Sequence, residues 1–185
     1  MRAGELRHRA EILALSPDLV ACSLGFRWVG IRVKDSADVQ AAGGLRVGAL
    51  VEVRARWSAD LVQGRYLRHS GRLLRIANAR DFKGDRSELV MSCEEFVGEP
   101  AEYRPAGLAP VCCRVHLRPV APYVDDDGRM TDYQLAAQVA LIEVGRIQVD
   151  DQLVVAGRTY NVIDYVNESD DGVVRSVWLE DLLCG

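Results

Sequence analysis

The feature that most constrains this chain is an internal repeat with a constant spacing. The segment GRLLRIANAR, which begins at Gly71, aligns without a gap on GRTYNVIDYV, which begins at Gly157, an offset of 86 residues. In the same register Leu67 matches Leu153. In each copy a strand pattern precedes a glycine that can adopt a positive φ, and a second strand pattern follows. The repeat predicts the same β-hairpin twice, although two unrelated β-meanders with a glycine turn would also look alike.

Other segments alternate between apolar and polar residues with a period of two. This period is typical of antiparallel strands that bury one face and leave the other in water. The segment Tyr133–Val144 fits both a helical stripe and a strand, and we favour the strand because its neighbours are strands. The expected inward positions of the clearest strands are Val51, Val53, Ala55 and Trp57, then Leu89, Met91 and Cys93, then Cys113, Val115 and Leu117.

These patterns predict an all-β chain of two small antiparallel β-barrel or sandwich units. Three prolines between residues 98 and 110 predict a semi-rigid linker there, because proline stiffens the chain and cannot donate to a sheet ladder. The units would then be residues 1–97 and 111–185, the second a candidate duplicate of the first. Lys34–Gly48 is polar and rich in small residues, which predicts a long protruding loop in the first unit.

Composition narrows the classes of function. The net charge is −4, which disfavours a protein that grips nucleic acid through phosphates. No run of about 18 apolar residues exists, so the sequence predicts no membrane helix. The polar start MRAGELRHR predicts no secretory signal, and five cysteines without a regular spacing predict reduced thiols in a cytosol.

The sequence offers no constellation for catalysis or for a bound metal. None of His8, His69 and His116 has ligands at zinc spacing, and no phosphate-binding or nucleophile motif occurs. The consecutive Asp125–Asp127 fit a solvated turn better than a calcium loop, in which ligands occupy alternate positions. We therefore expect a protein that is not an enzyme and has no cofactor.

Five groups of residues form an ordered pattern in the first hundred positions. They are Gly4, Leu6, Arg7, His8, Arg9 and Ile12; Gly25, Phe26 and Trp28; Val51–Trp57; Gly71, Leu74 and Ile76; and Leu89, Met91, Cys93 and Glu94. In order and spacing they resemble the head–tail joining proteins of tailed bacteriophages, also called head-completion, stopper or adaptor proteins, over about residues 1–96. Leu74 departs from the aromatic residue that the family often has there, and residues 107–185 exceed its usual single domain.

The resemblance implies a structural component of the virion neck, assembled in the host cytoplasm. It implies a homo-oligomeric ring, between a portal or adaptor protein above and a tail-terminator or tail-tube protein below. Two barrels in each chain make twelve or six copies the expected numbers. Such a ring encloses DNA without reading its sequence, uses no membrane and can gate the channel. By this analogy the channel arm would consist of Lys34, Asp35, Asp38, Gln40, Gly43, Gly44 and Arg46.

Arginines concentrate in the first unit. Ring assembly needs complementary surfaces, and arginines of the first unit could pair with acids of the second across a subunit interface. A DNA-facing stripe and ordinary solvated strand faces are the alternatives. A tail-terminator or tail-tube component and a nucleic-acid-binding β-barrel remain the alternative functions. The expected interface charges are Arg54, Arg56, Arg72, Asp150, Asp151, Asp170 and Asp171.

Overall fold

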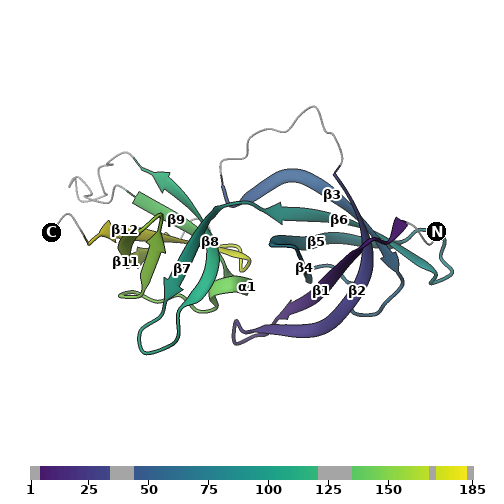
Figure 1. Ribbon diagram of the computed structural model, residues 1–185, viewed down its shortest axis with the longest axis horizontal. Helices are drawn as coiled ribbons and strands as arrows, with labels where there is room; N and C mark the ends of the chain where they lie inside the picture. The colour runs from purple at the N-terminus through teal and green to yellow at the C-terminus, as the bar shows by residue number, and fades with distance from the viewer. Residues whose placement is uncertain (1–4, 34–43, 121–134, 167–169, 183–185) are drawn as a thin grey trace. The chain divides into compact units, whose positions relative to one another are not determined.

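The structure, a computed structural model, describes residues 5–33, 44–120, 135–166 and 170–182. The chain divides into two compact units, residues 1–96 and 97–185. Figure 1 shows the strands of each unit curving around a core of their own. Each unit is a closed barrel of six antiparallel strands, which confirms the all-β prediction of two barrels.

The first barrel closes when β4 pairs with β1. Alternation decides which side chains fill it, because successive residues of a strand point to opposite faces. Val51, Val53 and Ala55 are at most 1 % exposed, and Met91 and Cys93 are completely buried, as the sequence predicts. Its strands are β1 (His8–Leu15), β2 (Ala21–Val33), β3 (Arg46–Arg56), β4 (Tyr66–His69), β5 (Arg72–Asp81) and β6 (Glu88–Phe96).

The second barrel has its own core and one short helix. Val177 and Leu179, which correspond to Met91 and Cys93 by the offset of 86, point inward, and Tyr103, Val139 and Leu153 join them. The barrel closes when β10 pairs with β7. Its elements are β7 (Glu99–Arg104), β8 (Val111–Pro119), β9 (Leu135–Ala140), α1 (Leu141–Val144), β10 (Gln152–Val155), β11 (Arg158–Tyr165) and β12 (Val174–Asp181).

The two barrels share one topology. The strand order β1-β2-β3-β6-β5-β4 of the first corresponds to β7-β8-β9-β12-β11-β10 of the second. The pairing registers also agree: Leu67 opposes Leu74 in the first barrel, and Leu153 opposes Tyr160, 86 positions later, in the second. The prediction of the same hairpin twice is therefore confirmed.

The correspondence extends to irregular features of the backbone. The register between β5 and β6 shifts directly after Ile76, and that between β11 and β12 shifts directly after Val162. The carbonyl of Ile76 accepts from Gly64 N at 2.9 Å, and that of Val162 accepts from Asp150 N at 2.8 Å. A β-bulge of this kind bends a strand locally, so both barrels curve at the same position.

Three sequence-based boundaries need correction. The predicted linker 98–110 is wrong over Glu99–Arg104, because these residues form β7, paired with both β8 and β10. Pro100 is tolerated there because it lies next to the start of the strand, where an amide donor is dispensable. In the predicted loop Lys34–Gly48, Arg46 already begins β3, and residues 34–43 lie outside the described residues. Leu135–Ala140 is the expected strand, but Leu141–Val144 is helical.

Asp151 is a structural carboxylate, which corrects its expected place among surface charges. It is 4 % exposed, accepts from Tyr103 Oη at 2.5 Å, and accepts from the amides of Gln148 at 2.7 Å and Ala106 at 2.9 Å. Burial, followed by the bond to Asp151, raises the pKa of the Tyr103 phenol well above its ordinary value. Asp151 therefore ties the start of β10 to the end of β7 from inside the barrel.

The turn glycines give the first prediction. Ser70 and Gly71 have φ of 48° and 78°, and Ala156 and Gly157 have φ of 49° and 81°. Two consecutive positive φ values define a two-residue turn that matches the twist of a hairpin. Gly157→Ala should destabilise the second barrel by about 1 kcal/mol, because a Cβ is strained in this region. Ala156→Gly should stabilise the same barrel slightly. Peptide-resolved hydrogen exchange measures each barrel separately, and equal effects of both substitutions would contradict this account.

The Asp151 contacts give the second prediction. Asp151→Ala should lower the free energy of unfolding of the second barrel by about 3 kcal/mol, because it removes the charged acceptor of three hydrogen bonds, one of which comes from the buried Tyr103. Asp150→Asn is the matched control: Asp150 is exposed with a φ of 71°, a conformation that asparagine tolerates. Hydrogen exchange in β10 and β11 should accelerate in the first variant alone. Unchanged exchange in Asp151→Ala would show that the carboxylate is dispensable.

Candidate interaction surface

Most of the predicted channel arm lies outside the described residues. Lys34, Asp35, Asp38, Gln40 and Gly43 belong to this group, so their role stays a prediction. Gly44 is described and lies in the bend two residues before β3. Arg46 is the first residue of β3, and its Nη1 lies 3.6 Å from Glu94 Oε2 of the neighbouring β6. Arg46 is therefore a strand residue that contacts its own barrel.

Arginines of the first barrel have carboxylate partners within that barrel. Arg72 donates from Nε and Nη2 to the two oxygens of Glu95, at 2.6 and 2.7 Å. This paired contact raises the pKa of Arg72 above its ordinary value. Arg54 Nε donates to Glu52 Oε1 at 2.9 Å, and its Nη1 lies 3.9 Å from Glu88 Oε1.

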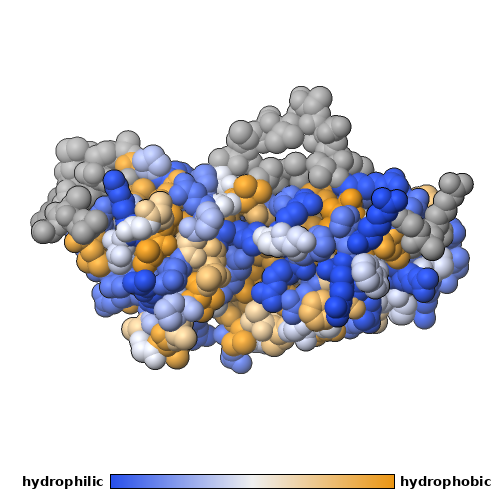
Figure 2. Space-filling view, viewed as in Figure 1, coloured by the Kyte–Doolittle hydropathy of each residue, from blue (hydrophilic) through white to orange (hydrophobic). Residues whose placement is uncertain are grey.

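Further pairs join neighbouring strands of the same barrel. Arg75 donates to Glu94 at 3.1 Å, and Arg68 donates to Glu11 at 2.6 Å. Cross-strand pairs of opposite charge neutralise the arginines where they stand. These ion pairs therefore weaken the case for a basic stripe facing DNA. Figure 2 shows polar residues interleaved with apolar ones on the visible face. Arg56 is exposed at the end of β3.

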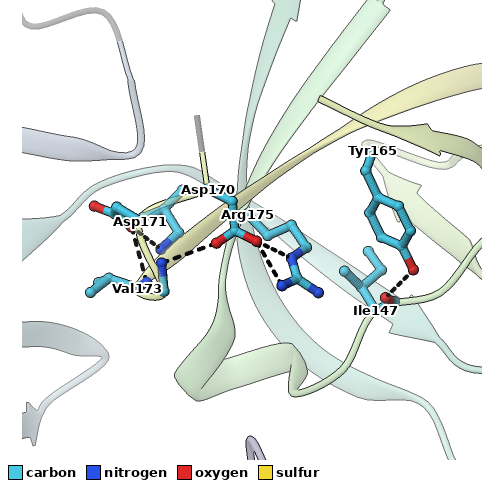
Figure 3. A network of polar contacts seen from close by, with 8 residues as sticks. Ile147, Tyr165, Asp170, Asp171, Val173 and Arg175 are labelled. Carbon is cyan, nitrogen blue, oxygen red and sulfur yellow. Dashed lines mark hydrogen bonds and ion pairs between the residues drawn. The ribbon is translucent and has the colours of Figure 1, made fainter. Parts of the chain in front are cut away.

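The remaining predicted acids lie in loops of the second barrel. Asp170 accepts from Arg175 Nε at 2.8 Å, and Asp171 accepts from the amides of Val173 and Val174, both at 2.9 Å (Figure 3). Asp150 is exposed. These contacts organise the turn before β12, and a role for these acids at a subunit interface stays a prediction.

The structure reveals an exposed aromatic face on β2 that the pattern of charges does not indicate. Trp28 is 58 % exposed and Phe26 is 49 % exposed. Arg9 of β1 opposes Trp28 in the sheet, and its guanidinium lies 4.5 Å from the centroid of the Phe26 ring. One signal was available in the sequence: Trp28 and Val29 are adjacent in a strand, so only one can face the core, and Val29 is the buried one.

The aromatic face, defined as Arg9, Phe26 and Trp28, lies on an incompletely paired part of β2. Among the described residues, β3 pairs with β2 only from Val29 to Val33, whereas β1 pairs with it as far as Ala21. The residues of β2 before Val29 therefore have a neighbouring strand on one side only. In the second barrel, Arg114 takes the place of Trp28 and donates to Glu143 at 3.0 Å. The aromatic face thus belongs to the first barrel alone.

The described part of the chain contains no cluster of three or more residues suited to hold a metal ion. His8 and His69 meet edge to face with ring centroids 4.9 Å apart, and His69 Nδ1 lies 3.0 Å from the Arg9 carbonyl oxygen. The contact between His69 and the Arg9 carbonyl holds the end of β4 next to β1. Among the residues described, no helix has the length and apolar character needed to cross a membrane.

Comparison with known proteins identifies the family. A model of the phage head-tail attachment protein matches residues 81–182, which is more than half of the chain. The match covers the end of the first barrel and nearly all of the second, whereas the motifs that resemble head–tail joining proteins lie in residues 1–96. No curated protein and no solved structure matches the chain. The chain therefore belongs to the phage head-tail attachment protein family, which indicates a structural role at the phage neck.

Proposed function

We propose that this chain forms a homo-oligomeric ring in the neck of a tailed phage or prophage, between the portal or adaptor of the filled head and the tail. Family membership supports the location. The observation that carries the proposal of protein contacts is the aromatic face of Arg9, Phe26 and Trp28, which the fold leaves open to solvent. Tryptophan and arginine are the residues most enriched where binding energy concentrates at protein interfaces.

The free energy gained by covering the aromatic face supports a docking role for it. Complete burial of one large apolar side chain contributes about 1.5–3 kcal/mol. Trp28 and Phe26 are each about half exposed. If a partner covered both, each side chain would contribute a substantial part of this burial free energy to binding. Since the equivalent strand of the second barrel has an ion pair in place of Trp28, the first barrel is the better candidate for this contact.

The paired barrels bear on copy number. A closed ring requires two different surfaces on each subunit that fit each other head to tail. The shared topology and register favour duplication of one barrel within the chain. Six chains would then supply twelve barrels, and twelve chains would each add an outer barrel.

Charge fits a conduit for DNA. The chain has a net charge of −4, and arginines of the first barrel are paired with its own acids. A wall whose arginines are neutralised in this way would hold sliding phosphates weakly. We propose that the ring encloses DNA without sequence-specific binding, and that the segment 34–46 contributes to gating of the DNA channel.

The aromatic face gives the third prediction. The double substitution Phe26→Ser/Trp28→Ser should reduce joining of filled heads to tails by at least tenfold, because it removes the apolar contact area. In vitro complementation of DNA-filled heads with tails, scored as infectious particles, measures the effect. Leu108→Ser is the control, since Leu108 is 75 % exposed in a loop of the second unit. Circular dichroism should show both variants folded.

Electron cryomicroscopy of the assembled neck tests the location independently. A ring of this chain between head and tail supports the proposal. A monomer without ring contacts, or a ring at the far end of the tail tube, would overturn it. Joining at the normal rate by the folded double variant would overturn the role of the aromatic face.

The channel arm gives the fourth prediction. Deletion of Ala37–Gly44 should leave the barrels folded, because the deletion ends before β3 begins at Arg46. Heads completed with this variant should lose packaged DNA or fail to join tails. Nuclease sensitivity of the packaged genome measures retention. Normal retention and normal joining together would show that the segment has no part in gating.

A further inference from the structure

The two barrels close corresponding ends in different ways. In the second barrel the Tyr165 ring packs against the core, and its hydroxyl donates to the Ile147 carbonyl at 3.1 Å (Figure 3). The Arg175 guanidinium lies 5.6 Å from the ring centroid, and its Nε donates to Asp170 at 2.8 Å. A single tyrosine thus fills this end of the barrel, and an ion pair covers it.

The first barrel has alanine at the same position. Tyr165 opposes Val177 in β12, and Ala79, 86 positions earlier, opposes Met91 in β6. By the same offset Leu61 corresponds to Ile147, whose carbonyl binds the tyrosine. The first barrel therefore keeps an apolar side chain in place of Ile147 but has no ring, and Leu89 stands where the second barrel has Arg175.

A cavity of about 290 Å³ lies at this end of the first barrel. Leu61 and Leu89 are buried and form its apolar floor, whereas Trp57 and Val62 are 40 % and 44 % exposed at its rim. The lining residues are Trp57, Ser58, Ala59, Leu61, Val62, Gln63, Ala79, Asp81 and Leu89.

A difference in the connecting segment contributes to the opening. After β3 ends at Arg56, residues 57–60 lead directly to Leu61. The corresponding connection of the second barrel, residues 141–146, is longer and contains α1, which places Val144 in the core cluster. Trp57, which the alternation predicts to face inward, lies beyond the end of β3 and forms the rim instead.

We propose that this cavity binds one aromatic side chain, a tyrosine or phenylalanine, of a partner protein. The occupant is inferred from the second barrel, which holds its own tyrosine in the equivalent place. The volume is slightly below that of pockets for drug-sized ligands and suits a single ring. The Arg86 guanidinium lies 5.5 Å from the Trp57 ring centroid, which puts a positive charge at the rim, complementary to the negative face of an entering ring.

That the partner is a neck protein rests on the proposed function, whereas the preference for an aromatic ring does not. The first experiment therefore uses p-cresol as the probe and the full-length protein as the target. Two-dimensional amide NMR should show saturable shifts at the Trp57 indole N–H and at the amides of Leu61, Val62 and Ala79. Absence of these shifts would overturn the proposal.

Two variants test the site. Ala79→Tyr should abolish the p-cresol shifts, because the new ring occupies the cavity as Tyr165 does in the second barrel. Asn78→Tyr is the matched control, since Asn78 is the exposed neighbour on the same strand, and it should leave binding unchanged. If Ala79→Tyr fails to fold, Ala79→Leu supplies a smaller obstruction and should weaken binding. Undiminished binding to a folded Ala79 variant would overturn the assignment.

Joining of heads to tails tests the partner. Ala79→Tyr should reduce joining at least tenfold, whereas Asn78→Tyr should not. If p-cresol binds but Ala79→Tyr particles join normally, docking of a partner side chain is overturned, while the neck function still stands on the ring and on the aromatic face. If the chain forms no neck ring but p-cresol binds as expected, the claim that the partner is a neck protein is overturned, and the assignment of an aromatic-ring site is supported.

Discussion

Closure of each six-stranded sheet on itself is the constraint on which the rest of this structure depends. A closed barrel has one inside, so every inward residue of all six strands must fit a single small core. This requirement accounts for the complete burial of Val53, Met91 and Cys93. It also accounts for the agreement of the two barrels in strand order and register, because a one-residue slip in any strand would turn its apolar side outward.

Closure leaves the outer faces and the ends free to diverge. On the outer face, the first barrel exposes Trp28 where the second has an ion pair of Arg114 with Glu143. At one end, the second barrel is filled by Tyr165, whereas the first has Ala79 and a cavity. Two barrels of the same topology can thus serve different contacts, and the first barrel has the more open surfaces.

Asp151 shows why charge alone is a poor guide to an interface. Its neighbours in the sequence suggest an exposed acidic pair with Asp150, yet the two carboxylates have opposite environments. The left-handed backbone at Asp150 turns the chain so that Asp151 enters the barrel, where three donors satisfy it. Burial of a carboxylate is tolerated only with such partners, and their positions come from segments far apart in the chain.

The sequence by itself determined the β class, the repeated hairpin and most inward positions, because these depend on alternation and on turn glycines, which are local. It also contained the family resemblance through short ordered motifs. Only the tertiary structure decided that Glu99–Arg104 is a strand, that Arg54 and Arg72 are paired within their barrel, and that Ala79 leaves a cavity where Tyr165 fills one. Each of these depends on which strands become neighbours when the sheet closes, and pairing between residues distant in sequence leaves no local pattern to read.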